Sequence, residues 1–269
     1  MLLSRLTRLC FILCFLVALA NASLQGQHID KQVYEVSWKK DGPILGGAIA
    51  GWIGTRYLVN NADKATESEV FALDRNDVWA FDRGATNNFS ESAESLSDVF
   101  LLSSFGVPLT LYLSHGVNEQ GIALGVMLVE TVFITDAMNN LFKATVKRYR
   151  PRSYNETLAL DERVNDQARL SFLSGHTSMT AAMTFLSAKV LTEIHSDSKW
   201  NKFIWASAIT IPAFNGYLRS KAGKHFPTDV MAGYALGAGI GLLIPNIHRS
   251  EHLTIGPGDL GGLSLTWTF

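Results

Sequence analysis

The stretch Arg219-Ser-Lys-Ala-Gly-Lys-His225-Phe-Pro-Thr-Asp229 places an arginine, a histidine and an aspartate immediately before an apolar run. Pro227 suits the first position of a helix, because its missing N–H would be unpaired there and its φ is preset. We therefore expect a helix that continues through Val230–Ile244. His225 would lie just before its N-terminus, where free N–H groups and the helix dipole favour negative charge.

These residue types suit phosphate chemistry. Asp229, in the first turn, is expected to hold one nitrogen of the His225 imidazole, so that the other nitrogen is free to attack. Arg219 can bind phosphate oxygens in a bidentate manner. The alternative is a solvated basic loop before a helix, which this stretch alone does not exclude.

A second cluster reads Lys143-Ala-Thr-Val-Lys147-Arg148-Tyr-Arg150-Pro151-Arg152. Lys143 and Arg150 are two helical turns apart, so they share a face, and Pro151 ends the helix. So many cations in so short a segment repel one another unless an anion binds there. The alternative is a solvated helix end, whose cations complement the dipole.

The third cluster is Ser174-Gly175-His176-Thr177, which precedes an apolar helix predicted over 178–191. Ser174 is a favourable N-cap residue, and Gly175 lets the backbone approach a ligand closely. The cluster therefore predicts an anion site at a helix N-terminus that also holds an imidazole. Helix capping alone would also explain it.

In chain order, the first motif is Lys143-x6-Arg150-Pro151, the second is Ser174-Gly175-His176 and the third is Arg219-x5-His225-x3-Asp229. In this order they resemble the signature of the type 2 phosphatidic acid phosphatase superfamily. That superfamily includes lipid phosphate phosphatases, bacterial non-specific acid phosphatases and vanadium haloperoxidases. The signature spans residues 143–229, and the flanking helices extend the resemblance over most of Ile44–Ile244. Leu173 stands where the family usually has proline, and Leu218 where it usually has serine. Neither position carries the nucleophile or the acid.

The resemblance implies an all-α, multi-helix bundle with about six core helices. It implies a metal-independent phosphatase, without a cofactor, that hydrolyses phosphomonoesters or pyrophosphates of lipids or small esters. His225 would be the nucleophile that forms a phosphohistidine, oriented by Asp229, and His176 would be the general acid. The residues implied to bind the phosphoryl oxygens are Lys143, Arg150, Ser174, Gly175 and Arg219. A vanadate-dependent haloperoxidase and a non-catalytic envelope protein that binds phosphorylated lipid headgroups remain alternatives.

The composition also bears on whether the chain binds nucleic acid and whether it is a membrane protein. The 269 residues suit one domain, and a net charge of −1 gives no global basic field for nucleic acid. Hydrophobic residues make up 47% of the chain and the mean hydropathy is +0.13. These values are apolar for a soluble protein but low for a polytopic membrane protein.

The N-terminus has the pattern of a signal peptide over residues 1–22. Arg5 and Arg8 form a basic region, Leu9–Ala20 is a short apolar run, and Ala20-Asn21-Ala22 is a small-residue cleavage signal. Both cysteines lie within it. We expect a polar segment over 23–42, a helical phosphatase domain over 43–249 and a packed C-terminal extension over 250–269.

The apolar segments leave three membrane topologies open. Their uninterrupted runs are mostly about fifteen residues, short of the roughly twenty that span a bilayer, and they contain Glu130, Asp136 and Lys189. All segments could span, which would place the site in the cytoplasm if the signal is cleaved. The first twenty residues could instead remain as an anchor while Ile44–Val59 does not span, which would leave the site facing the periplasm. The third topology, an exported soluble or peripheral protein of the periplasm or cell envelope, is the one that the run lengths and charges favour.

Overall fold

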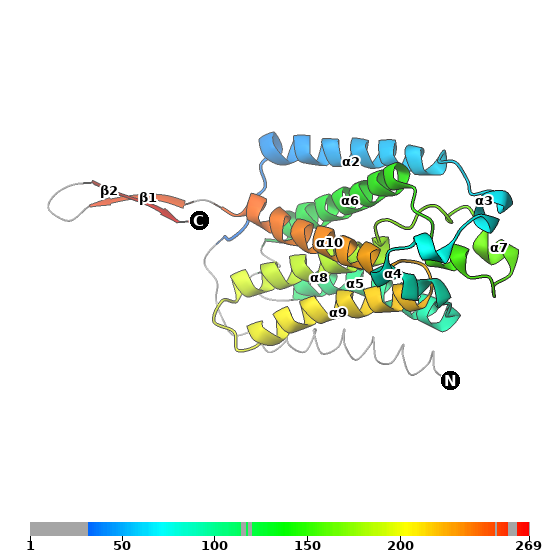
Figure 1. Cartoon of the computed structure of the whole chain (residues 1–269). Coiled ribbons are helices and arrows are strands. Elements are labelled where there is room, and N and C mark those ends of the chain that lie inside the picture. The colour runs from blue at the N-terminus through cyan, green and yellow to red at the C-terminus, as the bar shows by residue number, and fades with distance from the viewer. Residues whose placement is uncertain (1–31, 114–116, 118–119, 251, 258–262, 269) are drawn as a thin grey trace.

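The computed structural model describes residues 32–113, 117, 120–250, 252–257 and 263–268, the last two ranges by their backbone. The predicted signal peptide lies outside them. The core is a bundle of long helices, which confirms the predicted all-α fold (Figure 1). Six described helices have 20 residues or more: α2 (Trp38–Asn60), α5 (Glu91–Thr110), α6 (Gly121–Val146), α8 (Gly175–Ile194), α9 (Asn201–Lys221) and α10 (Pro227–His248).

Helix α8 is the centre of the bundle. It packs against α5, α6, α9 and α10, while α2 lies on the outer side of α6 (Figure 1). Most of its side chains are buried, since neighbouring helices surround it. Its N-terminus, which carries the Ser174-Gly175-His176 motif, is thereby held inside the bundle end that also carries the start of α10.

Glycines on one face of α10 allow it to approach α8 closely. A Cβ at Gly237 would lie 1.9 Å from the carbonyl oxygen of Ser178, and one at Gly233 would lie 2.7 Å from that of Ser174. Gly241 meets the backbone of α8 in the same way. Small residues at this spacing let helix backbones touch, which is a common way for helices to associate in membranes.

The polar segment between α2 and α5 forms several short helical pieces rather than one continuous helix. These pieces are α3 (Glu67–Phe71), η1 (Arg75–Asp77), α4 (Ala80–Arg83) and η2 (Gly84–Asn87). Asp74 causes one break, because its Oδ1 accepts a hydrogen bond from Asn76 N at 2.7 Å and starts a new turn. The segment thereby brings α4 against the start of α10.

The other described elements are short. They are η3 (Leu111–Leu113), η5 (Pro151–Tyr154), α7 (Leu160–Arg163), β1 (His252–Pro257) and β2 (Leu263–Thr268). β1 and β2 pair antiparallel, with His252 opposite Thr268. This hairpin extends from one end of the bundle (Figure 1), whereas a packed extension was expected. Helix α2 begins at Trp38, ahead of the predicted boundary at residue 43.

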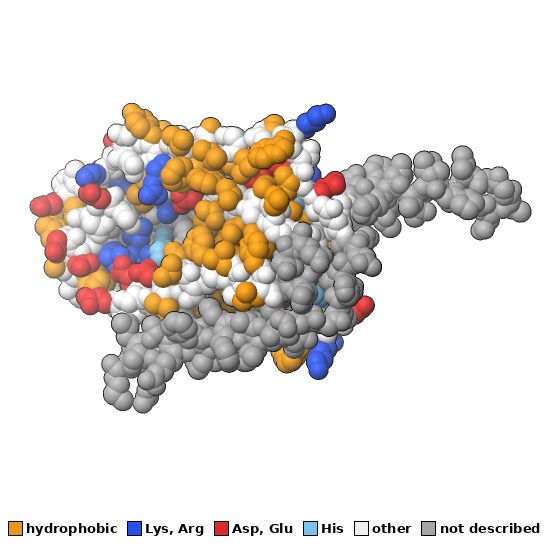
Figure 2. Space-filling view, turned by 180° about the vertical axis from the view of Figure 1, so that it is seen from behind, with side chains coloured by type: hydrophobic (Ala, Val, Ile, Leu, Met, Phe, Trp, Pro, Cys, Tyr) orange, Lys and Arg blue, Asp and Glu red, His pale blue; other side chains and the backbone are white. Residues whose placement is uncertain are grey.

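The prediction of a soluble or peripheral protein is wrong. Among the described residues, three helices are long and apolar enough to cross a membrane: Glu91–Leu113, Gly121–Tyr154 and Pro227–His248, with mean hydropathy of 1.5 to 1.7. Only 33% of each apolar window is buried inside the chain. Large side chains such as Leu102 and Ile122 are 75% and 81% exposed, and Figure 2 shows hydrophobic side chains gathered across the middle of one face. These features indicate an integral membrane protein.

The charges that argued against spanning lie inside the bundle. Asp136 accepts a hydrogen bond from Trp52 Nε1 at 2.8 Å, and Glu130 is fully buried. Charged residues within membrane helices commonly face the bundle interior and pair there. Charges inside the apolar runs therefore gave no evidence of a soluble protein.

The contact between α8 and α10 can be tested with two glycines of α10. We expect Gly237→Ala to lower the melting temperature in detergent, because overpacking costs about 1–3 kcal/mol. Gly239→Ala is the matched control, since a Cβ at Gly239 meets nothing within 4 Å. The control should leave the melting temperature unchanged or slightly higher. Equal melting temperatures for the two variants would contradict the proposed close contact.

Candidate active site

The N-termini of α8 and α10 lie side by side, so the Ser174-Gly175-His176 motif lies next to the motif that ends at Asp229. The backbone N–H of Ser174 donates to the carbonyl of Asp229 at 3.1 Å. Ser174 occupies the N-cap position as expected, but its side chain makes no cap hydrogen bond, and its Oγ lies 2.8 Å from Thr177 Oγ1. A Cβ at Gly175 would lie 3.3 Å from Lys143 Nζ, so the basic motif that begins at Lys143 also reaches this point.

His225 lies immediately before α10 and is only 2% exposed. Its Nδ1 lies 2.7 Å from the backbone carbonyl oxygen of Ser171. A carbonyl only accepts, so Nδ1 carries the proton and Nε2 of the neutral ring keeps its lone pair. Nε2 is therefore the ring nitrogen with an available lone pair.

Asp229 does not make the hydrogen bond to the His225 ring that the sequence analysis expected. Its Oδ2 accepts from Ser171 Oγ at 2.6 Å and from Phe226 N at 2.9 Å. A carboxylate in the first turn bends back to the N-cap backbone, as in a capping box, and this geometry directs Asp229 away from the ring. Asp229 thus holds Phe226, the residue after His225, and Ser171, whose carbonyl oxygen contacts the imidazole. Its link to the ring is therefore indirect.

Arg148 joins this carboxylate to a second one. Its Nη1 lies 2.6 Å from Asp229 Oδ1, and its Nη2 lies 2.7 Å from Asp82 Oδ2. Asp82 also accepts from the backbone N–H of Thr228 at 3.0 Å, and the Arg148 guanidinium lies 4.0 Å from the centre of the Phe226 ring. The positioning role of Arg148 was missed, although it lies within the basic cluster. No motif pointed to Asp82, which comes from α4.

Three cations surround His225. Burial and the positive charges of Arg150, Arg219 and Lys143 hold the pKa of His225 well below its ordinary value. His225 is therefore neutral at pH 7, as a nucleophile must be. Arg150 is held by Gln167, whose backbone and side-chain oxygens both lie 2.9 Å from its nitrogens. Arg219 donates from Nη1 to Ser97 Oγ at 3.0 Å.

His176 lies at the start of α8 with its Nε2 2.7 Å from Asp98 Oδ1. Burial and the charge of Arg219 lower the pKa of His176 to about 4, against the opposing effect of Asp98. A bound phosphate would raise this pKa, because a nearby negative charge favours the imidazolium. Asp98 comes from α5 and also lies 3.4 Å from Arg219 Nη1. It belongs to no motif, so the sequence analysis did not find it.

A cavity of about 640 Å³ opens over this cluster. His176, Arg150 and Arg219 line it together with the acidic side chains of Glu94 and Asp98. Figure 2 shows this mixture of Lys and Arg, acidic and histidine side chains at one end of the molecule, beside the hydrophobic band. An anion can therefore reach the cations from a surface that borders the membrane-exposed helices.

Leu173 and Leu218, the two departures from the family pattern, are both buried. Leu218 packs in an apolar cluster with Leu96 and Phe100 of α5. It therefore contributes packing where the family usually has a hydroxyl group.

The indirect route from Asp229 to His225 makes a testable distinction. We expect Asp229→Asn to lower kcat about 100-fold, because small misplacements of a catalytic group cost that much, and because it disturbs Arg148 and Phe226 as well. Ser171→Ala keeps the carbonyl that holds His225, so its loss should be clearly smaller. Steady-state kinetics on both purified variants, with melting temperatures to confirm folding, provide the measurement. A Ser171→Ala loss as large as that of Asp229→Asn would contradict the role assigned to the remaining Asp229 contacts.

Comparison with known proteins gives one family. Residues 122–252 match the model of the PAP2 superfamily, and they include every predicted site residue. Relatives include an undecaprenyl-diphosphatase of Sulfolobus acidocaldarius, 26% identical over 61% of this chain and 75% of that protein. Phosphatidylglycerophosphatase B of Bacillus subtilis is 30% identical, over 50% of this chain and 64% of the relative. Lipid A 4'-phosphatase of Porphyromonas gingivalis is 20% identical, over 55% of this chain and 61% of the relative.

One solved structure is also similar, that of a transmembrane PAP2-type phosphatidylglycerolphosphate phosphatase from Bacillus subtilis. The match has a TM-score of 0.43 and 18% identity, and it covers 88% of this chain and 93% of the other.

Residues 122–252 carry a PAP2 superfamily domain, which confirms the family resemblance predicted from the three motifs. The relatives are named phosphatases, so the predicted enzyme class, a phosphoric ester hydrolase, is also confirmed.

Proposed function

We propose that this member of the PAP2 superfamily hydrolyses lipid phosphates or lipid pyrophosphates through a phosphohistidine on His225. The observation that carries the proposal is the neutral imidazole, whose Nδ1 is held by the Ser171 carbonyl while Lys143, Arg150 and Arg219 lie around the ring. Cations placed this way stabilise the charge of a transferring phosphoryl group.

In the first step, Nε2 of His225 attacks phosphorus and the bond from phosphorus to the leaving oxygen breaks. His176 gives that oxygen a proton, for which the oxygen must displace Asp98 from His176 Nε2. Asp98 is more than half exposed, so it has room to move. In the second step water attacks phosphorus, His176 takes a proton from the water, and the electron pair of the N–P bond returns to Nε2.

The cationic side chains take the role that metal ions have in other phosphatases. Lys143, Arg150 and Arg219 neutralise phosphoryl oxygens, and Gly175 offers its backbone at the helix N-terminus. We therefore propose that turnover needs no metal ion at this site.

A lipid substrate fits the surroundings of the cavity. The helices next to it expose large apolar side chains, and the relatives are named for lipid substrates: undecaprenyl diphosphate, phosphatidylglycerophosphate and lipid A. Such a substrate would keep its chains in the bilayer while its phosphate enters the cavity from the side.

The role of His176 can be tested by the leaving group. We expect His176→Ala to reduce kcat/KM on an alkyl phosphate by about 100-fold or more, the usual contribution of general acid catalysis. The loss on p-nitrophenyl phosphate should be far smaller, because p-nitrophenolate needs little protonation. With a free-protein pKa of about 4, protonated His176 declines as pH rises above 4. Wild-type kcat/KM on the alkyl ester should therefore decline too, and this dependence should disappear in the variant. Equal losses on both substrates would refute the assignment.

The proposed activity is best tested with purified protein in detergent and in vesicles, with EDTA present. We expect phosphate release from phosphatidate or a prenyl pyrophosphate, with slower turnover of p-nitrophenyl phosphate and inhibition by orthovanadate. His225→Ala should abolish all turnover while the melting temperature stays near that of wild type. Strict dependence on an added metal, or full activity of the variant, would overturn the mechanism. A preference for the small ester would overturn the lipid assignment.

A further inference from the structure

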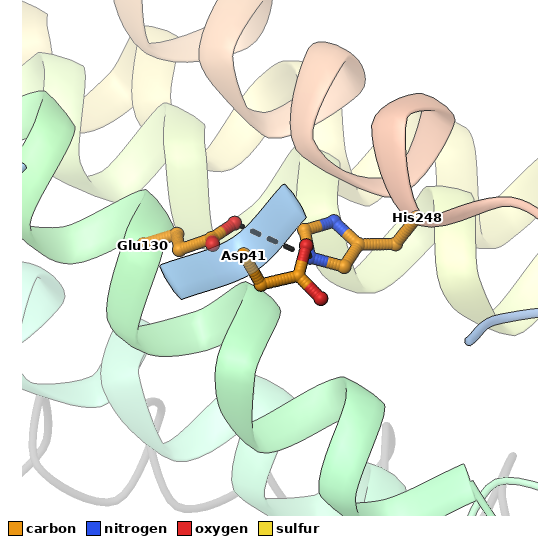
Figure 3. A group of neighbouring side chains, drawn as sticks. All are labelled: Asp41, Glu130 and His248. Atoms are coloured by element: carbon orange, nitrogen blue, oxygen red, sulfur yellow. Dashed lines mark ion pairs between the residues drawn. The ribbon is translucent and has the colours of Figure 1, made fainter. Parts of the chain in front are cut away.

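A second cluster of ionisable side chains lies at the opposite end of α10 from His225. Asp41 from the first turn of α2, Glu130 from the middle of α6 and His248 from the end of α10 point toward one another (Figure 3). The 22 residues of α10 separate this cluster from the phosphate cavity by roughly 30 Å, at about 1.5 Å per residue. The proposed phosphatase mechanism does not use it.

All three side chains are buried without solvent contact, and their facing atoms lack hydrogen-bond partners. Glu130 and His248 are 0% exposed, and neither carboxylate oxygen of Glu130 accepts a hydrogen bond from the described residues. Asp41 Oδ1 and His248 Nε2 likewise have no hydrogen-bond partner among the described residues. Buried carboxylates without a partner are costly, and a bound cation would satisfy them.

The outer atoms of His248 and Asp41 are held in the orientation that a metal ligand requires. His248 Nδ1 lies 2.9 Å from the carbonyl oxygen of Ile244, so Nδ1 carries the proton and the Nε2 lone pair faces the carboxylates. Asp41 Oδ2 accepts from Ser37 N at 2.6 Å, which leaves Oδ1 directed at His248. Hydrogen bonds of this kind typically orient metal ligands from behind.

The spacing fits one ion between three ligands. His248 Nε2 lies 3.2 Å from Asp41 Oδ1 and 3.3 Å from Glu130 Oε2. Ligands placed tetrahedrally at about 2.0 Å from zinc are about 3.3 Å apart. Lys40 is the nearby cation, but its Nζ donates to the backbone carbonyl of Ile247. An imidazole nitrogen among the ligands favours a transition metal over Mg²⁺ or Ca²⁺.

We propose that Asp41, Glu130 and His248 bind a divalent transition metal ion, of which Zn²⁺ is the best fit, and that this ion joins α2, α6 and α10. Its role is structural. The ion would hold the start of α2 against two central helices, far from the reacting phosphate, so chelation should change stability rather than turnover.

The test uses the full chain purified in detergent, loaded with Zn²⁺ and desalted, with metal content measured by mass spectrometry. We expect about one zinc per chain in wild type and at least about tenfold weaker binding in Asp41→Asn and Glu130→Gln. Asp136→Asn is the matched control: it removes a carboxylate from the same helix, α6, outside the cluster, and should retain the zinc. Zinc should raise the melting temperature of wild type and the control but not of the two variants.

Several results would overturn the site. Wild-type protein that binds no more zinc than Glu130→Gln would show that a proton on His248, rather than a metal, satisfies the carboxylates. Loading by Mg²⁺ or Ca²⁺ in preference to Zn²⁺ would refute the transition-metal assignment. Because the wild-type titration needs no variant, a misfolded substitution does not prevent the test. Hydrolysis of p-nitrophenyl phosphate with EDTA present separates it from the proposed function: activity should persist while the melting temperature falls.

Discussion

The contact between the backbones of α8 and α10 is the constraint on which the site depends. Gly233, Gly237 and Gly241 remove the side chains that would separate the helices, and Ser174 N then reaches the Asp229 carbonyl. The two helix N-termini consequently lie next to each other, with His176 at the start of one and His225 just before the other. Both helix ends contribute positive dipole potential to the same small volume.

That volume already carries an excess of positive charge. Arg150 and Arg219 are buried, and Lys143 lies against Gly175. Acidic side chains offset part of this charge at the rim: Glu94 pairs with Arg152 and Lys224, and Asp98 pairs with Arg219. An incoming phosphate completes the neutralisation from within. The arrangement favours a dianionic ligand, and it keeps both imidazoles neutral until that ligand arrives.

The fold class and the site composition were predictable from the sequence because the motifs are short and local. Lys143, Arg150, His176 and His225 were predicted at helix ends, and Arg219 was predicted as a phosphate ligand. The structure brings these residues together, but α6 ends at Val146, so Arg150 does not continue it as expected. Contacts across the bundle were not predictable. Asp98, Asp82 and Ser171 come from segments without a motif, and only the folded chain shows that they meet His176, Arg148 and Asp229.

The error about the membrane has a related cause. Charged residues within an apolar run favour a helix in contact with water. Asp136 and Glu130 instead face other helices. A sequence does not show which side of a helix a neighbouring helix covers. The direct bond between Asp229 and His225 was also wrong in detail. The backbone N–H at a helix N-cap competes for a carboxylate in the first turn. Asp229 accepts a hydrogen bond from Phe226 N instead of from the His225 ring.

The placement of the nucleophile late in the chain has a consequence for biosynthesis. His225 depends on the carbonyl of Ser171 for its tautomer, and the approach of α8 to α10 depends on glycines as far along as Gly241. A nascent chain that has formed α2, α5, α6 and α8 but not α10 holds Lys143, Arg150 and His176 without His225. Under the proposed mechanism, catalytic competence begins only when α10 has joined the bundle, so incomplete chains would not hydrolyse the proposed lipid substrates.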